Sequence, residues 1–170
     1  WGYQYFGVEP DVMTIAKAMG GGVPIGAFLC KDSCDVLRPG DHGSTYGGNA
    51  LTCAASYAVL KHVEEEGLVE RGRLMGERLK SKLEEVKARH ESSIKEVRGM
   101  GLLLAVEFHE TISGEIVVSC NARGLLLNPV RPNAVRFMPP LNISDAEVDI
   151  AVDRFERSLE DTLQRIEKSK

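Results

Sequence analysis

One lysine near the start of the chain has neighbours that suit covalent chemistry. Lys17 lies between Ala16 and Ala18 and precedes three glycines, in the stretch TIAKAMGGGVPIG. A lysine that bonds to an aldehyde must be partly desolvated to lose its proton, and it needs small neighbours so that a planar partner can approach. A surface lysine at a helix end, stabilised by the helix dipole, fits the same position. Position alone favours the surface lysine.

The glycines after Lys17 do not match a nucleotide-binding loop. A P-loop places its lysine after the glycine-rich turn and follows it with Ser or Thr. Lys17 comes before the glycines, and no GxGxxG motif follows a predicted strand. The sequence therefore argues against nucleotide binding through these motifs.

A second candidate is the loop HGSTYGGN, residues 42–49. The adjacent hydroxyls of Ser44 and Thr45, flanked by glycines, can hold a phosphate near the start of a helix. Flexible surface loops commonly have the same composition, and Asn49 is suited to cap the helix that follows. By itself the loop is a weak indication of anion binding.

The third candidate is Arg136, in the stretch NAVRFMPP between Val135 and Phe137. In a strand its side chain points away from the face that carries these apolar neighbours. An arginine fork can bind a substrate carboxylate through two parallel hydrogen bonds, which a lysine cannot reproduce. A strand arginine that faces water, or pairs with a carboxylate of the protein, is an equally good interpretation.

The composition is that of an ordinary globular protein and excludes several classes. Apolar residues make up 43% and charged residues 27% of the chain, and the formal net charge of -4 argues against a general nucleic-acid binder. No apolar run is as long as a membrane span, and no signal peptide opens the chain. The four cysteines are scattered and the four histidines lack metal-site spacing. We therefore expect reduced thiols, a cytoplasmic location and no metal site.

The first fifty residues are rich in glycine and proline. We expect a short helix from Val12 to about Met19, which Asp11 caps and the glycines end. The stretch PIGAFLC, residues 24–30, is apolar and bounded by breakers, which predicts a buried strand. Residues 38–49 are predicted to form a loop.

The remaining residues predict helices and strands in mixed order. Helices are expected at 50–66, 68–90 and 112–123, and strand candidates lie on both sides of the Gly99–Gly101 turn within 94–108 and at 124–128 and 134–140. The last helix begins at a capping box formed by Ser144 and Glu147. Its apolar residues recur at helical spacing and predict a core stripe of Val148, Val152, Phe155, Leu159, Leu163 and Ile166. The order of elements predicts an α/β fold with a boundary near Gly67, which separates a glycine-rich α/β part, residues 1–67, from a small α+β part, residues 68–170.

Four separated blocks of the sequence together resemble the class III, pyridoxal-phosphate-dependent aminotransferases, nearest to the acetylornithine and ornithine aminotransferases. The blocks are PDVMTIAKAMGGGVPIGAFL, PGDHGSTYGGNALTCAA, VRGMGLLLAVEF and VRFMPPLNIS. They occur in the family's order, and the resemblance as a whole covers essentially all 170 residues. The resemblance implies a fold-type I transferase, with residues 1–67 as the end of the large cofactor-binding domain and residues 68–170 as the small C-terminal domain.

The resemblance also implies roles for the three candidate sites. Lys17 matches the lysine that forms a Schiff base with pyridoxal 5'-phosphate and then moves a proton between substrate and cofactor. Thr45 matches the residue that binds the cofactor phosphate of the neighbouring subunit in a homodimer, and Ser44 matches a position near the substrate. Arg136 matches the arginine that holds the substrate α-carboxylate.

Part of the family's site is not found in this sequence. In the family the aspartate that pairs with the ring nitrogen, the stacking aromatic residue and the main phosphate loop all precede the lysine. We therefore expect the chain to be about the C-terminal two-fifths of such an enzyme. Without a carboxylate at the ring nitrogen the cofactor is a poorer electron sink, so we expect the full-length enzyme, and not these residues alone, to transaminate.

The function implied by the resemblance is transfer of the terminal amino group of N²-acetylornithine to 2-oxoglutarate, in arginine biosynthesis. Ornithine and 4-aminobutyrate are alternative amino donors. An alternative of another class is a catalytically incomplete fragment that acts only as a folding or dimer-interface module. Its partners are expected to be a small-molecule amino acid, a 2-oxo acid and a second copy, with no nucleic acid and no membrane.

Overall fold

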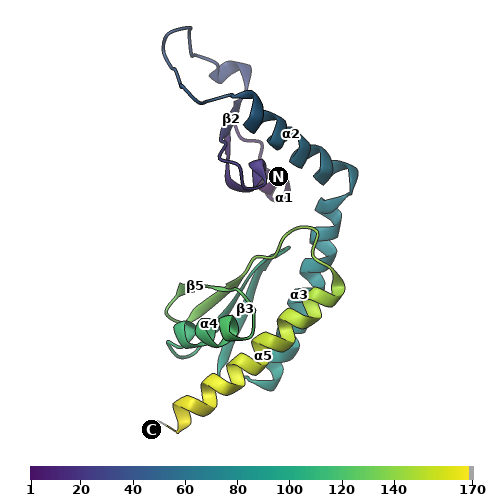
Figure 1. Cartoon of the computed structure of the whole chain (residues 1–170), viewed down its shortest axis with the longest axis vertical. Helices are drawn as coiled ribbons and strands as arrows, with labels where there is room; N and C mark the ends of the chain where they lie inside the picture. The colour runs from purple at the N-terminus through teal and green to yellow at the C-terminus, as the bar shows by residue number, and fades with distance from the viewer. Residues whose placement is uncertain (169–170) are drawn as a thin grey trace. The chain divides into compact units, whose positions relative to one another are not determined.

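The computed structural model describes residues 1–168, which form a mixed α/β protein. The chain divides into two compact units, Trp1–Glu66 and a second that starts at Gly67 (Figure 1). The first unit contains α1 (Gly2–Phe6), β1 (Val12–Ile15), the 3-10 helix η1 (Lys17–Gly20), β2 (Ala27–Cys30), the 3-10 helix η2 (Asp32–Cys34) and α2 (Ala50–Glu65).

The helix predicted from Val12 to Met19 is wrong, because its first half is a strand. β1 pairs antiparallel with β2, with Val12 opposite Cys30 and Ile15 opposite Ala27. Three of the four residues of β1 are β-branched, which suits a pleated strand better than a helix. Asp11 does not cap a helix: its carbonyl accepts from the amide of Lys31 at 2.9 Å, and its carboxylate lies 3.0 Å from Lys31 Nζ.

The strand predicted at residues 24–30 exists, but it is shorter and not buried. It spans Ala27–Cys30, and the side chains of Phe28 and Leu29 are 56% and 51% exposed. The described part of the first unit contains only a two-stranded ribbon, which offers no second layer to cover both faces. The apolar sequence predicts a strand in a protein core, whereas in this unit the side chains of the strand are exposed.

The helix predicted from Ala50 is confirmed as α2, and Asn49 caps it. The Asn49 side chain accepts from the amide of Thr52 at 3.0 Å, which satisfies one free donor of the first turn. At the other end Gly67 has a φ of 59°, a left-handed conformation that ends one helix before α3 begins.

The second unit packs three helices against a four-stranded sheet. Its elements are α3 (Leu68–Arg89), β3 (Ile94–Met100), β4 (Leu103–Phe108), α4 (Ser113–Ala122), β5 (Asn128–Arg131), β6 (Ala134–Phe137) and α5 (Asp145–Glu167). The sheet is antiparallel in the order β3-β4-β6-β5, and α3 and α5 run side by side (Figure 1). The predictions for α3, β3, β4, α4, β6 and α5 are confirmed, with small shifts at the ends.

The core lies between the helices and one face of the sheet. In β4 and β6 the alternate residues Leu104, Val106, Val135 and Phe137 are buried in it. The predicted stripe of α5 is confirmed: its first four residues are buried, and Leu163 and Ile166 pack against the core from its edge. Because side chains alternate along a strand, the residues between these core positions belong to the opposite face of the sheet.

The strand predicted at residues 124–128 is displaced toward the C-terminus, and β5 begins only at Asn128. Gly124, with a φ of 72°, follows the end of α4, and the amide of Leu125 donates to the carbonyl of Cys120 at 2.9 Å. These residues close the helix and leave too little chain for a strand there. Pro129 is tolerated in β5 because this strand lies at the edge of the sheet.

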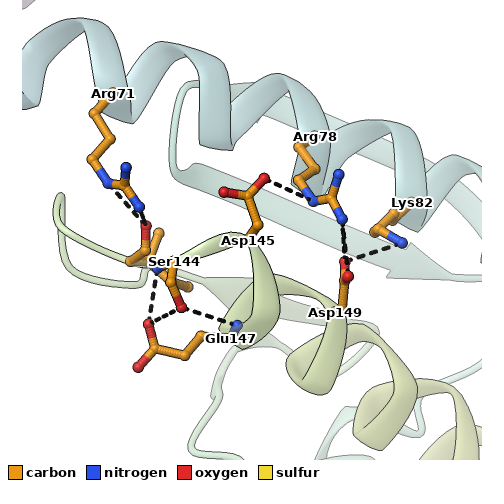
Figure 2. Close-up of polar contacts among 8 residues, drawn as sticks. Arg71, Arg78, Lys82, Ser144, Asp145, Glu147 and Asp149 are labelled. Carbon is orange, nitrogen blue, oxygen red and sulfur yellow. Dashed lines mark hydrogen bonds and ion pairs between the residues drawn. The ribbon is translucent and has the colours of Figure 1, made fainter.

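Polar contacts also connect α3 to the start of α5 (Figure 2). Both Nε and Nη2 of Arg71 donate to the carbonyl of Ile143, at 3.1 and 2.7 Å. Arg78 and Lys82 bind the carboxylate of Asp149, at 2.8 and 3.1 Å. Both bonds lower the pKa of Asp149, and the bond from Lys82 has the larger effect. The predicted capping box is present, since the Ser144 hydroxyl accepts from the Glu147 amide at 3.2 Å.

Candidate functional site

Lys17 directly follows β1 and has an unusual backbone conformation. Its φ is 56°, in the left-handed region that non-glycine residues seldom occupy, and among the described residues other than glycine it alone has a positive φ. The expectation that Lys17 sits in the last turn of a regular helix is therefore wrong, since it begins a 3-10 turn. Strained residues of this kind cluster at active sites and ligand clamps.

Lys17 lies at the rim of an open pocket of about 400 Å³. The other lining residues are Ala18, Gly22, Val23, Pro24 and Ile25, all from the turn between β1 and β2. The side chain of Lys17 is exposed, and its amine has no hydrogen bond or ion pair within the described part of the chain. A free primary amine beside small apolar groups is an arrangement suited to a flat ligand.

The three glycines after Lys17 have different tasks. A Cβ on Gly21 would lie 2.8 Å from Cγ2 of Val59, so this glycine lets the turn pack against α2. A Cβ on Gly20 would lie 2.8 Å from Cγ2 of Ile25. Gly22 lines the pocket and has no atom within 4 Å of its own added Cβ. Packing is thus a reason for Gly20 and Gly21, and the φ values of 61° at Gly21 and 111° at Gly22 favour glycine at both positions.

Ser44 and Thr45 lie in the loop between η2 and α2, and both are exposed. The Ser44 hydroxyl accepts from the amide of Gly47 at 2.8 Å, which folds the loop into a tight turn just before the cap of α2. Its own proton stays available for donation to a ligand. The lining of the Lys17 pocket includes neither hydroxyl residue, so the structure does not bring the two candidates into one cavity.

Arg136 belongs to the second unit and lies in β6, paired with Ala105 of β4 and Asn128 of β5. Its Nε is buried without a hydrogen-bond partner, and its guanidinium forms no ion pair with any residue that the structure describes. A buried, unpaired donor on a charged group is costly and calls for a ligand. The interpretation in which Arg136 pairs with a carboxylate of the protein is therefore not supported within the described residues.

Glu107 is a polar residue of the sheet that sequence analysis missed. It lies in β4 and is only 9% exposed. Its Oε1 is 2.8 Å from Lys95 Nζ, and its Oε2 is 3.4 Å from Arg98 Nη2. Both bonds lower the pKa of Glu107, and the bond from Lys95 has the larger effect. The alternation of the predicted strand pair was the only available signal, since it places Glu107 and Arg136 on the same face.

One group of side chains in the described part could in principle hold a metal ion. Ligand atoms of His90, Glu156 and Glu160 lie within 4.8 Å of one another. Both oxygens of Glu156 already accept from Arg89, at 2.6 and 2.8 Å, and these bonds lower the pKa of Glu156. The group therefore acts as an ion-pair connection between the end of α3 and α5. Within the described residues, no helix combines the length and apolar character needed to cross a membrane.

Comparison with known proteins gives a consistent family assignment. Residues 1–159 match the family described as Aminotransferase class-III. The chain is 47% identical over 156 residues to an acetylornithine aminotransferase of Synechocystis sp., covering 90% of this chain and 36% of that protein. It is 44% identical over 163 residues to an acetylornithine aminotransferase of Clostridium acetobutylicum, covering 92% of this chain and 41% of that protein. The chain thus spans about two fifths of the length of the curated relatives it matches.

Solved structures agree with the sequence matches. Ornithine δ-aminotransferase of Plasmodium falciparum has a TM-score of 0.84 at 34% identity, over 94% of this chain and 42% of that one. Acetylornithine aminotransferase of Elizabethkingia anophelis has a TM-score of 0.85 at 32% identity, over 93% of this chain and 43% of that one. An ornithine aminotransferase of Toxoplasma gondii has a TM-score of 0.85 at 34% identity, over 93% of this chain and 38% of that one. That protein holds pyridoxal phosphate at partial occupancy in its active site.

Proposed function

Because the chain belongs to the class III aminotransferases, we propose that the complete protein moves the terminal amino group of N²-acetylornithine to 2-oxoglutarate, a step of arginine biosynthesis. The substrate proposal is supported by acetylornithine aminotransferases that are 42–47% identical to this chain over 90–98% of its length. Lys17 carries the catalytic part of the proposal, since its amine is free, its backbone is strained and it borders a pocket.

The residues around Lys17 fit pyridoxal 5'-phosphate as the cofactor. The pocket of about 400 Å³ is within the range of roughly 300–1,000 Å³ usual for small-molecule sites. Lys17 would hold the cofactor through its amine, with Ala18 and Gly22 leaving room for a flat ring. When bound, pyridoxal phosphate supplies an electron sink that stabilises negative charge on the substrate carbon. Lys17 Nζ would then move a proton from the amine-bearing carbon of the substrate to the cofactor.

We assign Arg136 to the substrate carboxylate. Its guanidinium is unpaired and its Nε is buried, so a carboxylate that accepts two parallel hydrogen bonds satisfies the site. Lys17, in the first unit, would carry the chemistry, while Arg136, in the second unit, would orient the amino acid and the 2-oxo acid.

We propose that Thr45 binds the cofactor phosphate of a second copy in a homodimer, and that Ser44 lies near the substrate. Support comes from the exposure of both hydroxyls in the loop that leads into α2, because the first-turn amides and the dipole of a helix favour an anion. The Asn49 side chain accepts from the amide of Thr52, and this is the one first-turn amide of α2 that it satisfies. A threonine that serves the other copy need not line the pocket of the lysine in its own chain.

The test uses the complete gene product that contains this chain, loaded with pyridoxal phosphate. Borohydride reduction followed by peptide mass spectrometry should place a phosphopyridoxyl group on Lys17. The Lys17→Ala variant should lose this label and the amino transfer together. Lys31→Ala, which removes an exposed lysine of the same unit, is the control and should keep both. Labelling of another lysine with full activity in Lys17→Ala contradicts the proposal.

A donor screen separates the remaining alternatives. N²-acetylornithine should give the highest kcat/KM with 2-oxoglutarate, and ornithine is the main competitor because solved ornithine aminotransferases are also similar to this chain. Preference for ornithine or 4-aminobutyrate changes the substrate but keeps the reaction class. A correctly folded complete protein that neither takes the label nor turns over any donor supports the non-catalytic module instead.

A further inference from the structure

We propose that Lys95 and Arg98 are positioning residues that hold the carboxylate of Glu107 away from Arg136, so that Arg136 stays free for a substrate carboxylate. The inference rests on the proposed function of Arg136. It concerns the face of the four-stranded sheet opposite the helices, where charged side chains of three neighbouring strands gather.

The strand register brings Glu107 and Arg136 within reach of each other. Arg136 of β6 lies opposite Ala105 of β4, and Glu107 lies opposite Ala134, two residues along each strand. Diagonal neighbours of this kind have Cα atoms about 7–8 Å apart on the same face, which long side chains can bridge. Ala105, a small residue, leaves the space beside Arg136 open. An ion pair between Glu107 and Arg136 is therefore sterically accessible, and it would block the arginine.

A β-bulge directs Lys95 to Glu107. Ile94 pairs with Phe108 and Glu96 with Glu107, so Lys95 is the extra residue of β3 at this point. In a regular strand its side chain would alternate to the face opposite that of Glu96. The bulge places two residues against one and redirects the side chain of the first. Lys95 Nζ consequently lies 2.8 Å from Glu107 Oε1.

Arg98 occupies the other oxygen of Glu107. It lies opposite Ala105 on β3, so Arg98 and Arg136 flank the same small residue from two sides. Its Nη2 is 3.4 Å from Glu107 Oε2, and its Nε is 3.7 Å from Glu96. Glu107 is thus bound by two cations of β3, and it accepts no hydrogen bond from Arg136. A nearly buried carboxylate that lost both partners would need a new cation, and Arg136 is the neighbour that can supply it.

The test measures binding of glutarate, a non-reacting dicarboxylate, to the complete protein by calorimetry, together with KM and kcat. In Lys95→Met/Arg98→Met we expect glutarate affinity to fall about tenfold or more, because Arg136 becomes engaged in a charge-assisted bond. The KM for the substrate carboxylates should rise with little change in kcat. Adding Glu107→Gln to this double variant should restore binding, because the competing carboxylate is gone.

A matched control removes a similar cation pair on the helices. Arg78→Met/Lys82→Met takes two cations from Asp149 and should lower the thermal midpoint while leaving glutarate affinity unchanged. Arg136→Met should abolish glutarate binding. If Arg136→Met binds glutarate like the wild type, the proposed role of Arg136 fails and this inference fails with it.

Three other results contradict the inference alone, provided that Arg136→Met loses glutarate. They are unchanged affinity in folded Lys95→Met/Arg98→Met, failure of Glu107→Gln to restore it, and weakened binding in Glu107→Gln by itself. If the double variant does not fold, Lys95→Met is compared with Lys95→Met/Glu107→Gln. The same order of affinities is expected there, with a smaller difference.

Discussion

Gly76 of α3 packs directly on the backbone of Gly101, in the turn between β3 and β4. A Cβ added at Gly76 would lie 2.3 Å from the carbonyl carbon and 2.4 Å from the carbonyl oxygen of Gly101. Gly101 itself has a φ of 52°, which favours glycine in the turn. The helix therefore approaches the hairpin more closely than any other residue type would allow.

Gly76→Ala should destabilise the protein by about 2 kcal/mol or more, because the added methyl group meets backbone that cannot move aside cheaply. Urea unfolding of the complete protein measures the change in midpoint. Gly114→Ala is the matched control, since its added Cβ meets no atom within 4 Å in helix α4. It should be neutral or stabilising by up to about 1 kcal/mol. Equal effects of the two substitutions would show that the close approach is not rigid.

The left-handed backbone of Lys17 predicts a difference between two variants that both lack the amine. Lys17→Ala keeps a Cβ at a φ of 56°, whereas Lys17→Gly removes it. In the cofactor-free protein, Lys17→Gly should be more stable than Lys17→Ala by about 1 kcal/mol, offset in part by the extra freedom of glycine in the unfolded chain. Thermal unfolding of both variants, side by side, makes the measurement. A more stable alanine variant argues that the turn is not strained.

The capping box at the start of α5 predicts a local loss of stability in Ser144→Ala. The Ser144 hydroxyl accepts from the Glu147 amide, and the Glu147 carboxylate accepts from the Ser144 amide at 2.8 Å. Loss of the serine should cost about 0.5–2 kcal/mol. Ser81→Ala, at an exposed position inside α3, is the control and should be neutral or slightly stabilising. Hydrogen exchange at the first amides of α5 should speed up only in Ser144→Ala.

Acid should destabilise the start of α5 and its contacts with α3. Bonds from the amide and hydroxyl of Ser144 lower the pKa of Glu147 below its ordinary 4.5, and Lys82 and Arg78 lower the pKa of Asp149 below its ordinary 3.8. Both carboxylates therefore bind protons more readily in the unfolded chain. Their stabilising contribution is complete above these ordinary values and is lost as the pH falls through them toward the lowered folded values.

Urea midpoints measured across the acid range test this dependence. Asp149→Asn should reduce the slope of midpoint against pH, because one carboxylate that titrates differently in the folded and unfolded states is removed. Glu115→Gln, an exposed residue of α4, should leave the wild-type slope in place. A slope in Asp149→Asn that equals the wild-type slope would assign the acid sensitivity to other carboxylates.

The second unit could be predicted well because its local signals agree with its tertiary structure. Local patterns are enough to specify several of its elements. They are the apolar spacing in α3 and α5, the capping box at Ser144 and the glycines of the turn between β3 and β4. The first unit was predicted less well. Pro10 and Asp11 are good helix-start residues, but pairing of Val12–Ile15 with β2 prevailed over that local preference. Residues 124–127 follow the end of α4, where the chain turns out of the helix before β5 begins.

The sequence by itself determined the candidates for chemistry, namely Lys17, the Ser44–Thr45 loop and Arg136, because these depend on residue type and order along the chain. It could not determine their surroundings. The left-handed turn at Lys17, the packing of Gly20 and Gly21 and the unpaired Nε of Arg136 arise only when strands pair and helices pack against them. The same holds for Lys95, whose side chain reaches Glu107 only because β3 carries one extra residue. Such features depend on register and close contact between distant segments, which no local pattern records.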